Sequence, residues 1–339
     1  MSFMAPRQLT DADEYRHARP EGSGDLLFGD TLWVSVVDPK AGIHGVIHAH
    51  LTNNGFARFE SLFVIDGVVQ LYGNKVPLQP EPDRGPFSDG RLSYTVVKPW
   101  EHIAIEFDWE AFGFALDFRA RFAPFDYAEC LPNGDPLARV GPFHGGHYEQ
   151  AMSCTGNFEI RRGPNAGEMR KIDCWSHRDH TWSDRFAAPP QWKIDEVHFA
   201  SHYWPSVQLP ERHINVFGSY FENALEPSQK SIGGFVSDKD GSRPLLNATA
   251  ELEPNDGTAA VREAKKFRYA FTLPDGDVIH VQSSQVHGQI QLWLRAENDL
   301  ENRLDCYEAF CDFEVEETGE RGTGTAEYSI MPVFPQWKA

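Results

Sequence analysis

The densest group of chemically active side chains in the sequence lies between residues 173 and 185. This segment reads Asp-Cys-Trp-Ser-His-Arg-Asp-His-Thr-Trp-Ser-Asp-Arg, so histidines, aspartates, arginines and tryptophans stand almost side by side. Adding water to an alkene, or removing it, requires a proton donor, a proton acceptor and a surface that tolerates positive charge. The segment contains side chains for all three tasks.

The segment continues a strand-like region, and side chains along a strand alternate between its two faces. Each face then carries both ionisable and aromatic groups. Trp175, His177 and Asp179 share one face, and Arg178, His180 and Trp182 share the other.

Catalytic roles follow from these residue types. In an apolar environment Asp179 stays protonated and acts as the acid, because burial raises the pKa of a carboxyl group. His177 or His180 positions water or carries the proton. Trp175 or Trp182 stabilises a cation over its ring. We therefore predict Asp179, His180 and His177 as catalytic residues, with Trp175 and Trp182 against the substrate.

A purely structural interpretation competes with this one on equal terms. Arg178 and Arg185 would pair with Asp179 and Asp184 in a buried ion-pair network. A guanidinium beside Asp179 lowers the pKa of the carboxyl group, which leaves His180 as the better acid.

Two further groups are predicted to contact substrate. The first follows a glycine-rich stretch that lets the backbone approach a ligand, although glycines also simply mark turns. The second shares one face of a predicted strand, where ordinary core histidines are the alternative. The first group is His147, Tyr148 and Glu149, and the second is His198, His202 and Trp204.

His44, His48 and His50 also share one side of a predicted strand. Ile43 and Ile47 occupy the other side, so solvent exposure is the simpler expectation for the histidines. Histidines two apart on a strand need a further ligand from elsewhere to hold a metal ion, and we expect no metal site.

Composition excludes several classes of protein. The chain has 31 basic and 50 acidic residues, and a net charge of −19 repels nucleic acids and anionic membranes. The five cysteines lack CxxC spacing, which is typical of reduced, buried thiols. The known nucleotide and zinc-protease motifs do not occur, so we expect no cofactor. Neither a long apolar run nor a signal peptide is recognisable, which predicts a cytoplasmic protein without membrane insertion.

Turn signals separate many short strand-like runs, which predicts an all-β protein with antiparallel strands and few short helices. The clearest hairpin joins residues 62–65 to 68–71 through Asp66-Gly67, and two more are expected around 163–167 and 274–277.

Helical periodicity is confined to residues 10–17 and 258–266. The polar segment is followed by Pro189-Pro190 and then by a new strand-like run. We therefore expect two domains, 1–188 and 189–339, each about the size of a barrel domain.

Five motifs follow one another in order: His147–Gln150, a strand containing Gly156, the hairpin at 163–167, His177–Arg185 and Gly322–Tyr328. This order resembles the carotenoid 1,2-hydratase (hydroxyneurosporene synthase) and AttH-like superfamily, whose signature reads roughly His-Arg-Asp-His-Ser-Trp-Gly-x-Arg. The chain departs from the superfamily at Ser176, where glycine commonly precedes the histidine, and at Ser183, which replaces the glycine after tryptophan.

The resemblance implies two lipocalin-like antiparallel β-barrels packed together. It also implies cofactor-free chemistry on hydrophobic, often terpenoid or polyketide, substrates, such as hydration, dehydration, isomerisation or cyclisation. A shared fold does not by itself separate an enzyme from a carrier.

The leading hypothesis is a cofactor-independent lyase or isomerase, of the hydratase, dehydratase or double-bond isomerase type. It would act by acid–base chemistry on a hydrophobic terpenoid-like, steroid-like or aromatic small molecule. The alternative is a non-catalytic carrier of hydrophobic ligands with the same fold, and a structural module with filled barrels is a third option. The sequence leaves a homodimer open.

Overall fold

The computed structural model describes residues 9–18, 28–52, 55–78, 84–136, 145–183, 198–222, 229–254, 263–293 and 305–330. Strands make up 70% of the structure and helices 3%, which confirms the all-β prediction. The helices of these ranges are two short 3-10 turns, η1 (Asp11–Glu14) and η2 (Tyr127–Glu129). Among the described residues, no helix has the length and apolar character to cross a membrane.

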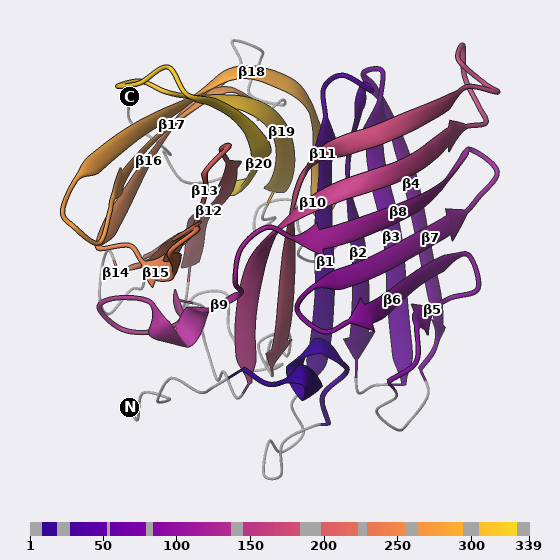
Figure 1. Cartoon of the computed structure of the whole chain (residues 1–339), viewed down its shortest axis with the longest axis horizontal. Helices are drawn as coiled ribbons and strands as arrows, with labels where there is room; N and C mark the ends of the chain where they lie inside the picture. The colour runs from indigo at the N-terminus through magenta and orange to yellow at the C-terminus, as the bar shows by residue number, and fades with distance from the viewer. Residues whose placement is uncertain are drawn as a thin grey trace. The chain divides into compact units, whose positions relative to one another are not determined.

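The chain divides into two compact units, each built on one sheet (Figure 1). The N-terminal unit consists of Ala5–Ala128 and Gly141–Ala187, and the C-terminal unit includes Glu129–Val140 and Ala188–Ala339. Cys130 links the first of these two C-terminal segments to the second, because its thiol lies 3.8 Å from the carbonyl oxygen of Gly234. The predicted junction at Pro189-Pro190 lies outside the described residues.

The N-terminal unit contains an 11-stranded antiparallel sheet with the order β4-β3-β2-β1-β11-β10-β8-β7-β6-β5, and β9 pairs with β10. The sheet curls, so that β6–β8 lie across β1–β4 in Figure 1. Its strands are β1 (Gly29–Asp38), β2 (Ile43–Thr52), β3 (Phe56–Ile65), β4 (Val68–Pro77), β5 (Phe87–Ser88), β6 (Leu92–Lys98), β7 (His102–Asp108), β8 (Phe112–Ala120), β9 (Phe125–Asp126), β10 (Gly146–Ile160) and β11 (Met169–Ser183).

The C-terminal unit contains a nine-stranded antiparallel sheet with the order β15-β14-β13-β12-β20-β19-β18-β17-β16. Its strands are β12 (His198–Gln208), β13 (Arg212–Glu222), β14 (Gln229–Asp238), β15 (Gly241–Pro244), β16 (Asn247–Pro254), β17 (Ala264–Thr272), β18 (Val278–Trp293), β19 (Asp305–Val315) and β20 (Arg321–Ile330).

The two sheets share one plan. In each unit the first strand pairs with the last, and the last pairs with a long strand before it. Hairpins then extend the sheet outward on both sides. The central strands are β1, β11 and β10 in one unit and β12, β20 and β19 in the other. The prediction of two lipocalin-like antiparallel units is confirmed, and each is a curled half-barrel.

The predicted hairpins are present. Asp66 and Gly67 join β3 to β4 with φ angles of 50° and 79°. A two-residue hairpin turn of this kind needs positive φ at both central positions, which an Asp-Gly pair adopts at little cost. Residues 163–167 lie between β10 and β11, and residues 274–277 lie between β17 and β18.

The two helical predictions fare differently. Within residues 10–17 the structure has only the short turn η1, in which the backbone N–H of Thr10 donates to the Asp13 carboxylate. Of the stretch 258–266, residues 258–262 lie outside the described ranges, and Ala264–Lys266 belong to β17. That part of the helix prediction is wrong, because pairing with β16 and β18 outweighs the local propensity.

Each sheet packs one face on a hydrophobic core. Val34, Met152 and Ile172 mark this core face in the N-terminal unit, and Phe313 and Tyr328 mark it in the C-terminal unit. We call the opposite face of each sheet its outer face.

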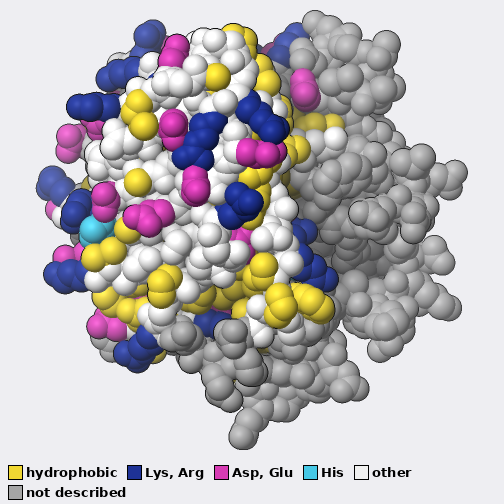
Figure 2. Space-filling model, turned by 90° about the vertical axis from the view of Figure 1, so that its right-hand side faces the viewer, with side chains coloured by type: hydrophobic (Ala, Val, Ile, Leu, Met, Phe, Trp, Pro, Cys, Tyr) yellow, Lys and Arg dark blue, Asp and Glu magenta, His cyan; other side chains and the backbone are white. Residues whose placement is uncertain are grey.

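One face of the molecule carries side chains of mixed character. Figure 2 shows basic and acidic side chains interspersed, with hydrophobic side chains scattered among them. Isolated exposed apolar side chains are normal on globular proteins. The ionisable groups of the candidate site are instead buried side chains of the sheets.

Candidate active site

Four predicted residues meet on the outer face of β10 and β11. His147 Nε2 lies 2.8 Å from Asp179 Oδ2 and 3.1 Å from Glu149 Oε1. His177 Nε2 lies 2.7 Å from the other carboxyl oxygen of Glu149. Strand pairing explains the contact, since Glu149 lies directly across from Asp179 in the sheet. We call His147, Glu149, His177 and Asp179 the first cluster.

The first cluster is almost completely buried. The side chains of His147 and Glu149 expose 0% of their surface, that of His177 exposes 3% and that of Asp179 exposes 6%. Asp179 is therefore the least buried of the four side chains. Its carboxyl group also accepts a hydrogen bond of 2.8 Å from the hydroxyl of Thr181.

Aromatic rings flank the first cluster. Tyr127 stacks on His147 with ring centroids 4.1 Å apart, and Trp33 meets His177 edge-on at 5.5 Å. Trp33 also lies directly across from Asp179 in the pairing of β1 with β11. A half-buried tryptophan thus stands beside the most exposed carboxyl group of the cluster.

The arrangement is suited to proton transfer. An imidazole that contacts two carboxyl groups can pass its proton to either one, and His147 has this position between Asp179 and Glu149. His177 contacts Glu149 from the other side. The four side chains form one continuous chain from His177 to Asp179.

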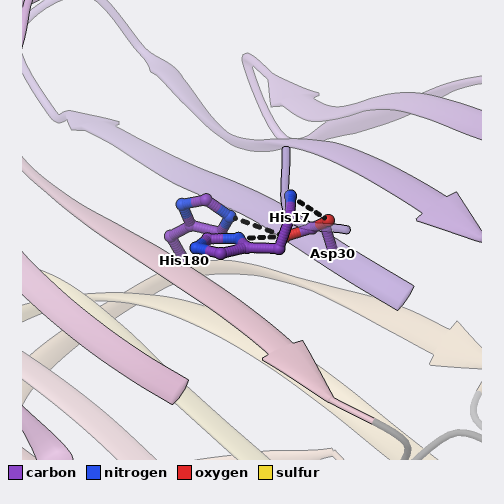
Figure 3. Close-up of side chains that lie close together, drawn as sticks. All are labelled: His17, Asp30 and His180. Carbon is purple, nitrogen blue, oxygen red and sulfur yellow. Dashed lines mark hydrogen bonds and ion pairs between the residues drawn. The ribbon is translucent and has the colours of Figure 1, made fainter. Parts of the chain in front are cut away.

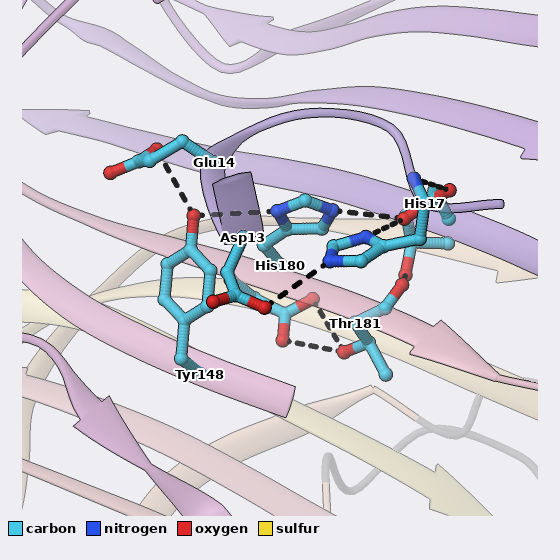
Figure 4. Close-up of polar contacts among 9 residues, drawn as sticks. Asp13, Glu14, His17, Tyr148, His180 and Thr181 are labelled. Atoms are coloured by element: carbon cyan, nitrogen blue, oxygen red, sulfur yellow. Dashed lines mark hydrogen bonds and ion pairs between the residues drawn. The ribbon is translucent and has the colours of Figure 1, made fainter. Parts of the chain in front are cut away.

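A separate polar network lies on the core face of the same strands (Figure 4). The hydroxyl of Tyr148 lies 3.1 Å from Glu14 Oε2 and 3.3 Å from His180 Nδ1. His180 Nε2 in turn lies 3.1 Å from Asp30 Oδ1. This network joins η1, β1, β10 and β11 and is fully buried at Glu14, Asp30, Tyr148 and His180.

Arg178 belongs to this core-face network and does not pair with Asp179. Its guanidinium donates to both carboxyl oxygens of Glu14, at 2.6 and 2.7 Å, and its Nε donates to Gln150 at 2.9 Å. The predicted pairing with Asp179 is wrong, because adjacent residues of a strand point to opposite faces. Asp184 and Arg185, the other predicted pair, lie outside the described residues.

The partner of His180 is the carboxylate of Asp30, which also contacts His17 (Figure 3). Burial lowers the pKa of His180, so the imidazole is neutral at neutral pH. Burial alone raises the pKa of Asp30, but the hydrogen bonds from His17 and His180 outweigh it and the net pKa is lowered. An acid–base pair of His180 with Asp179 is not formed, since the two side chains lie on opposite faces of β11.

Trp175 and Trp182, the two tryptophans predicted to contact substrate, pack against other side chains of the protein. The guanidinium of Arg121 lies over the ring of Trp175, at 4.5 Å from the centroid. Trp182 lies on the core face and stacks on His17 at 3.7 Å. Trp33, which the sequence did not single out, is the tryptophan that stands beside Asp179.

The histidines of β2 differ from the expectation. His44 is buried, with 4% of its surface exposed, and His48 is half-buried and lies 3.0 Å from Glu60. Solvent exposure was therefore the wrong prediction for this face. The alternation of apolar residues identifies the core face of a strand, but it does not show whether the opposite face is covered.

In the C-terminal unit, His202 and Trp204 lie on the outer face of β12. His202 Nε2 is 2.6 Å from Glu327 Oε1, so this buried histidine has the carboxylate partner that sequence spacing did not reveal. Trp204 meets Phe217 edge-on at 5.1 Å. The side chain of His198 lies outside the described residues.

Among the residues that the structure describes, three groups of side chains have the composition to hold a metal ion, because the donor atoms within each group lie within 4.8 Å of one another. Two of these groups are in the N-terminal unit and one is in the C-terminal unit. They are His147 with Glu149 and Asp179, His17 with Asp30 and His180, and His202 with Cys306 and Glu327.

The sequence contained signals for some of the missed residues. Asp30 shares strand parity with the apolar Leu32 and Val34, and a charged group on the apolar side of a strand indicates a buried partner. Trp33 stands on the polar side of the same strand. For Glu14, which lies in a short acidic turn, no comparable signal exists.

A family model described as "Domain of unknown function (DUF7064)" matches residues 10–332. No curated protein sequence matches the chain. The comparison with known sequences therefore assigns a family without an activity.

Several solved structures share the fold. An AttH candidate (NE1406) from Nitrosomonas europaea aligns with a TM-score of 0.65 at 11% identity, over 97% of this chain and 98% of its own. CghA, solved with Sch210972, aligns with a TM-score of 0.61 at 10% identity, over 91% and 90%. Kievitone hydratase from Nectria haematococca aligns with a TM-score of 0.59 at 15% identity, over 89% of each chain. The resemblance to the AttH-like fold seen in the sequence is confirmed.

Proposed function

This chain belongs to the DUF7064 family, and we propose that it is a cofactor-independent enzyme that moves a proton to or from a hydrophobic small molecule. The reaction would be a hydration, a dehydration or a double-bond isomerisation. The observation that carries the proposal is the first cluster, in which two imidazoles and two carboxyl groups form one buried chain of contacts. Buried, coupled ionisable groups are typical of sites that transfer protons.

Asp179 exchanges the proton with the substrate, because it is the most exposed member of the first cluster. His147 lies 2.8 Å behind it and carries the proton to and from Glu149. Glu149 orients both imidazoles through its two oxygens. These three roles need no group beyond the side chains themselves.

In the hydration direction, protonated Asp179 gives its proton to one carbon of the alkene. Water adds to the other carbon, and the proton that this water releases returns to the first cluster. The cluster ends in its starting state, and dehydration follows the same path in reverse. Trp33 faces the developing positive charge, to which an aromatic ring contributes roughly 0.5–2 kcal/mol of stabilisation.

The names of two solved structures with this fold agree with the proposed type of reaction. The name kievitone hydratase describes a hydration, and CghA was solved with Sch210972. For this chain we propose a terpenoid-like, steroid-like or aromatic substrate. The cytoplasmic location expected from the sequence stays a prediction.

Deuterium incorporation tests this function across many candidate substrates at once. The protein is incubated in D₂O with a panel of hydrophobic alkenes and alcohols, and each compound is analysed by mass spectrometry. At least one compound should gain deuterium, and Asp179→Asn should slow the incorporation by roughly 10²–10⁴-fold. Asp117→Asn is the matched control, because Asp117 also contacts a histidine, at 2.6 Å from His102, but is half exposed. It should leave the rate unchanged.

Two results would contradict the proposal. Compounds that bind tightly while no compound of the panel gains deuterium would favour the carrier. Deuterium incorporation that is equally fast in Asp179→Asn would place the chemistry elsewhere in the chain.

A further inference from the structure

A second group of ionisable side chains lies on the outer face of the C-terminal unit. His202 belongs to β12, Cys306 and Glu308 belong to β19, and Glu327 belongs to β20. The donor atoms of His202, Cys306 and Glu327 lie within 4.8 Å of one another. Glu308 stands directly across from Glu327. We call these four residues the second cluster.

The second cluster occupies the same place in its sheet as the first cluster does in the other. In both sheets, two acidic residues face each other across the last two strands, and a tryptophan of the first strand lies across from one of them. The corresponding trios are Trp33, Asp179 and Glu149 in the N-terminal unit and Trp204, Glu327 and Glu308 in the C-terminal unit.

The neighbouring positions differ in a way that changes the chemistry. Where the first cluster has His147 and His177, the second has Cys306 and Thr325. Two imidazoles are thus replaced by a thiol and a hydroxyl. His202 supplies the imidazole of the second cluster from β12.

The two carboxyl groups of the second cluster differ, because Glu327 contacts the imidazole of His202 whereas Glu308 contacts no imidazole, arginine or lysine among the described residues. In the described part of the chain, no ion pair joins Glu308 or Glu327 to an arginine or lysine. Glu308 is completely buried, and neither of its oxygens makes a hydrogen bond of normal geometry there, although Thr325 and Glu327 lie beside it. Burying a carboxyl group without a hydrogen bond or an ion pair destabilises the folded protein. A bound cation would remove that cost.

We propose that the second cluster binds one divalent metal ion, with Zn²⁺ as the best match. Imidazole nitrogen, thiolate sulfur and carboxylate oxygen are the ligands that Zn²⁺ takes in proteins. Three adjacent strands present these donors on one face, which a sheet holds rigidly in place. The expectation of no metal site rested on short spacings, whereas these ligands lie on β12, β19 and β20 and become neighbours only through the fold.

The two metal-capable groups of the N-terminal unit fit a metal ion less well. Neither contains a sulfur donor. The carboxyl groups of Asp179 and Asp30 also accept hydrogen bonds within the protein, and each oxygen of Glu149 contacts an imidazole. Asp179 contacts Thr181 and His147, and Asp30 contacts His17 and His180.

Cobalt provides a direct test of this site, because a cobalt ion bound to a thiolate shows a charge-transfer absorption band that carboxylate and imidazole ligands do not produce. Titration of the metal-free wild type with Co²⁺ should generate this band up to one equivalent, and Zn²⁺ should remove it. Cys306→Ser should abolish the band. Cys311→Ser is the matched control, since Cys311 is equally buried on β19 but lies on the core face.

A second variant covers the case in which Cys306→Ser does not fold. Glu308→Gln keeps the thiolate, so the charge-transfer band should remain. The affinity for Co²⁺ should fall by about 10–100-fold, which is the usual effect of removing a residue that contacts the metal ligands. A wild type that shows no thiolate band, or a band that persists in Cys306→Ser, would refute the site. So would a Glu308→Gln variant with unchanged affinity. None of these outcomes depends on enzymatic activity, so the site can fail while the proposed proton transfer stands.

Discussion

Arg178 and Glu14 form a buried ion pair with two parallel hydrogen bonds, of 2.6 and 2.7 Å, although 164 positions separate them in the chain. Glu14 also accepts hydrogen bonds from the backbone N–H of Trp100 and from the hydroxyl of Tyr148. The pair fastens η1 to the core face of β11. Because every oxygen of Glu14 has a donor, the pair is a structural element of the N-terminal unit.

Glu14→Gln should destabilise the protein strongly. Arginine cannot lose its proton inside a protein, so the substitution leaves an uncompensated charge in the core. Breaking such a pair costs about 3–5 kcal/mol, which corresponds to a fall of roughly 6–20 °C in Tm for a unit of this size. Thermal unfolding followed by circular dichroism measures the effect. A fall of less than about 2 °C would show that the guanidinium finds another partner or reaches water.

Acidification should narrow the stability gap between the wild type and Arg178→Met. In the wild type, burial alone raises the pKa of Glu14, but the guanidinium of Arg178 and the backbone N–H of Trp100 together outweigh burial, and the net pKa lies below its ordinary value of 4.5. The stabilisation is therefore complete above the ordinary pKa and is lost as the pH falls through the folded pKa. In Arg178→Met, Glu14 stays buried without the cation, so its carboxylate takes up a proton more readily. The free-energy cost of burying the charged carboxylate is then lost in acid.

Denaturant unfolding of both proteins between about pH 7 and pH 4 measures this gap. Arg161→Met is a suitable control, because Arg161 forms ion pairs that are largely exposed. Its effect on stability should be small at every pH. A gap between wild type and Arg178→Met that stays constant on acidification would mean that Glu14 does not carry the charge in the native state.

Local patterns in the sequence were sufficient for part of this picture. Strand alternation correctly separates His177 and Asp179 from Arg178 and His180, and Asp-Gly correctly predicts the β3–β4 hairpin. These features depend on neighbours in the chain. Local patterns do not predict which strands pair. β1 and β11 are neighbours in the sheet although they lie far apart in the chain.

The partners of the site residues were missed for the same reason. Asp30 reaches His180 across 150 positions, and Glu327 reaches His202 across 125. A carboxylate at such a distance cannot be assigned to a histidine from spacing. The predicted pairing of Arg178 with Asp179 was wrong because the side chains of consecutive residues in a strand point to opposite faces.

His180→Gln should affect stability and spare catalysis. His180 belongs to the core-face network of Asp30 and Tyr148, whereas the proposed proton transfer uses the outer face. Weakening its hydrogen bond to the ionised Asp30 should cost about 1–3 kcal/mol. Rates of deuterium incorporation per folded molecule, measured well below Tm, should stay within about twofold of wild type. A loss of 10²-fold or more in a folded variant would move the catalytic site to the core face.

Trp33→Leu should lower the rate of chemistry more than it lowers substrate binding. Trp33 lies across from Asp179 and stands edge-on to His177, so its ring is placed where positive charge develops in the proposed reaction. Loss of a cation–π contribution of roughly 0.5–2 kcal/mol corresponds to a rate decrease of about 2- to 30-fold. Trp33→Phe keeps a ring and should recover part of the rate, whereas leucine provides only apolar contact.

Trp175→Leu is the matched control, because the ring of Trp175 already lies under the guanidinium of Arg121. Steady-state kinetics that separate kcat from KM decide the question, and an equal loss in Trp33→Leu and Trp33→Phe, confined to KM, would show that Trp33 contributes only to binding.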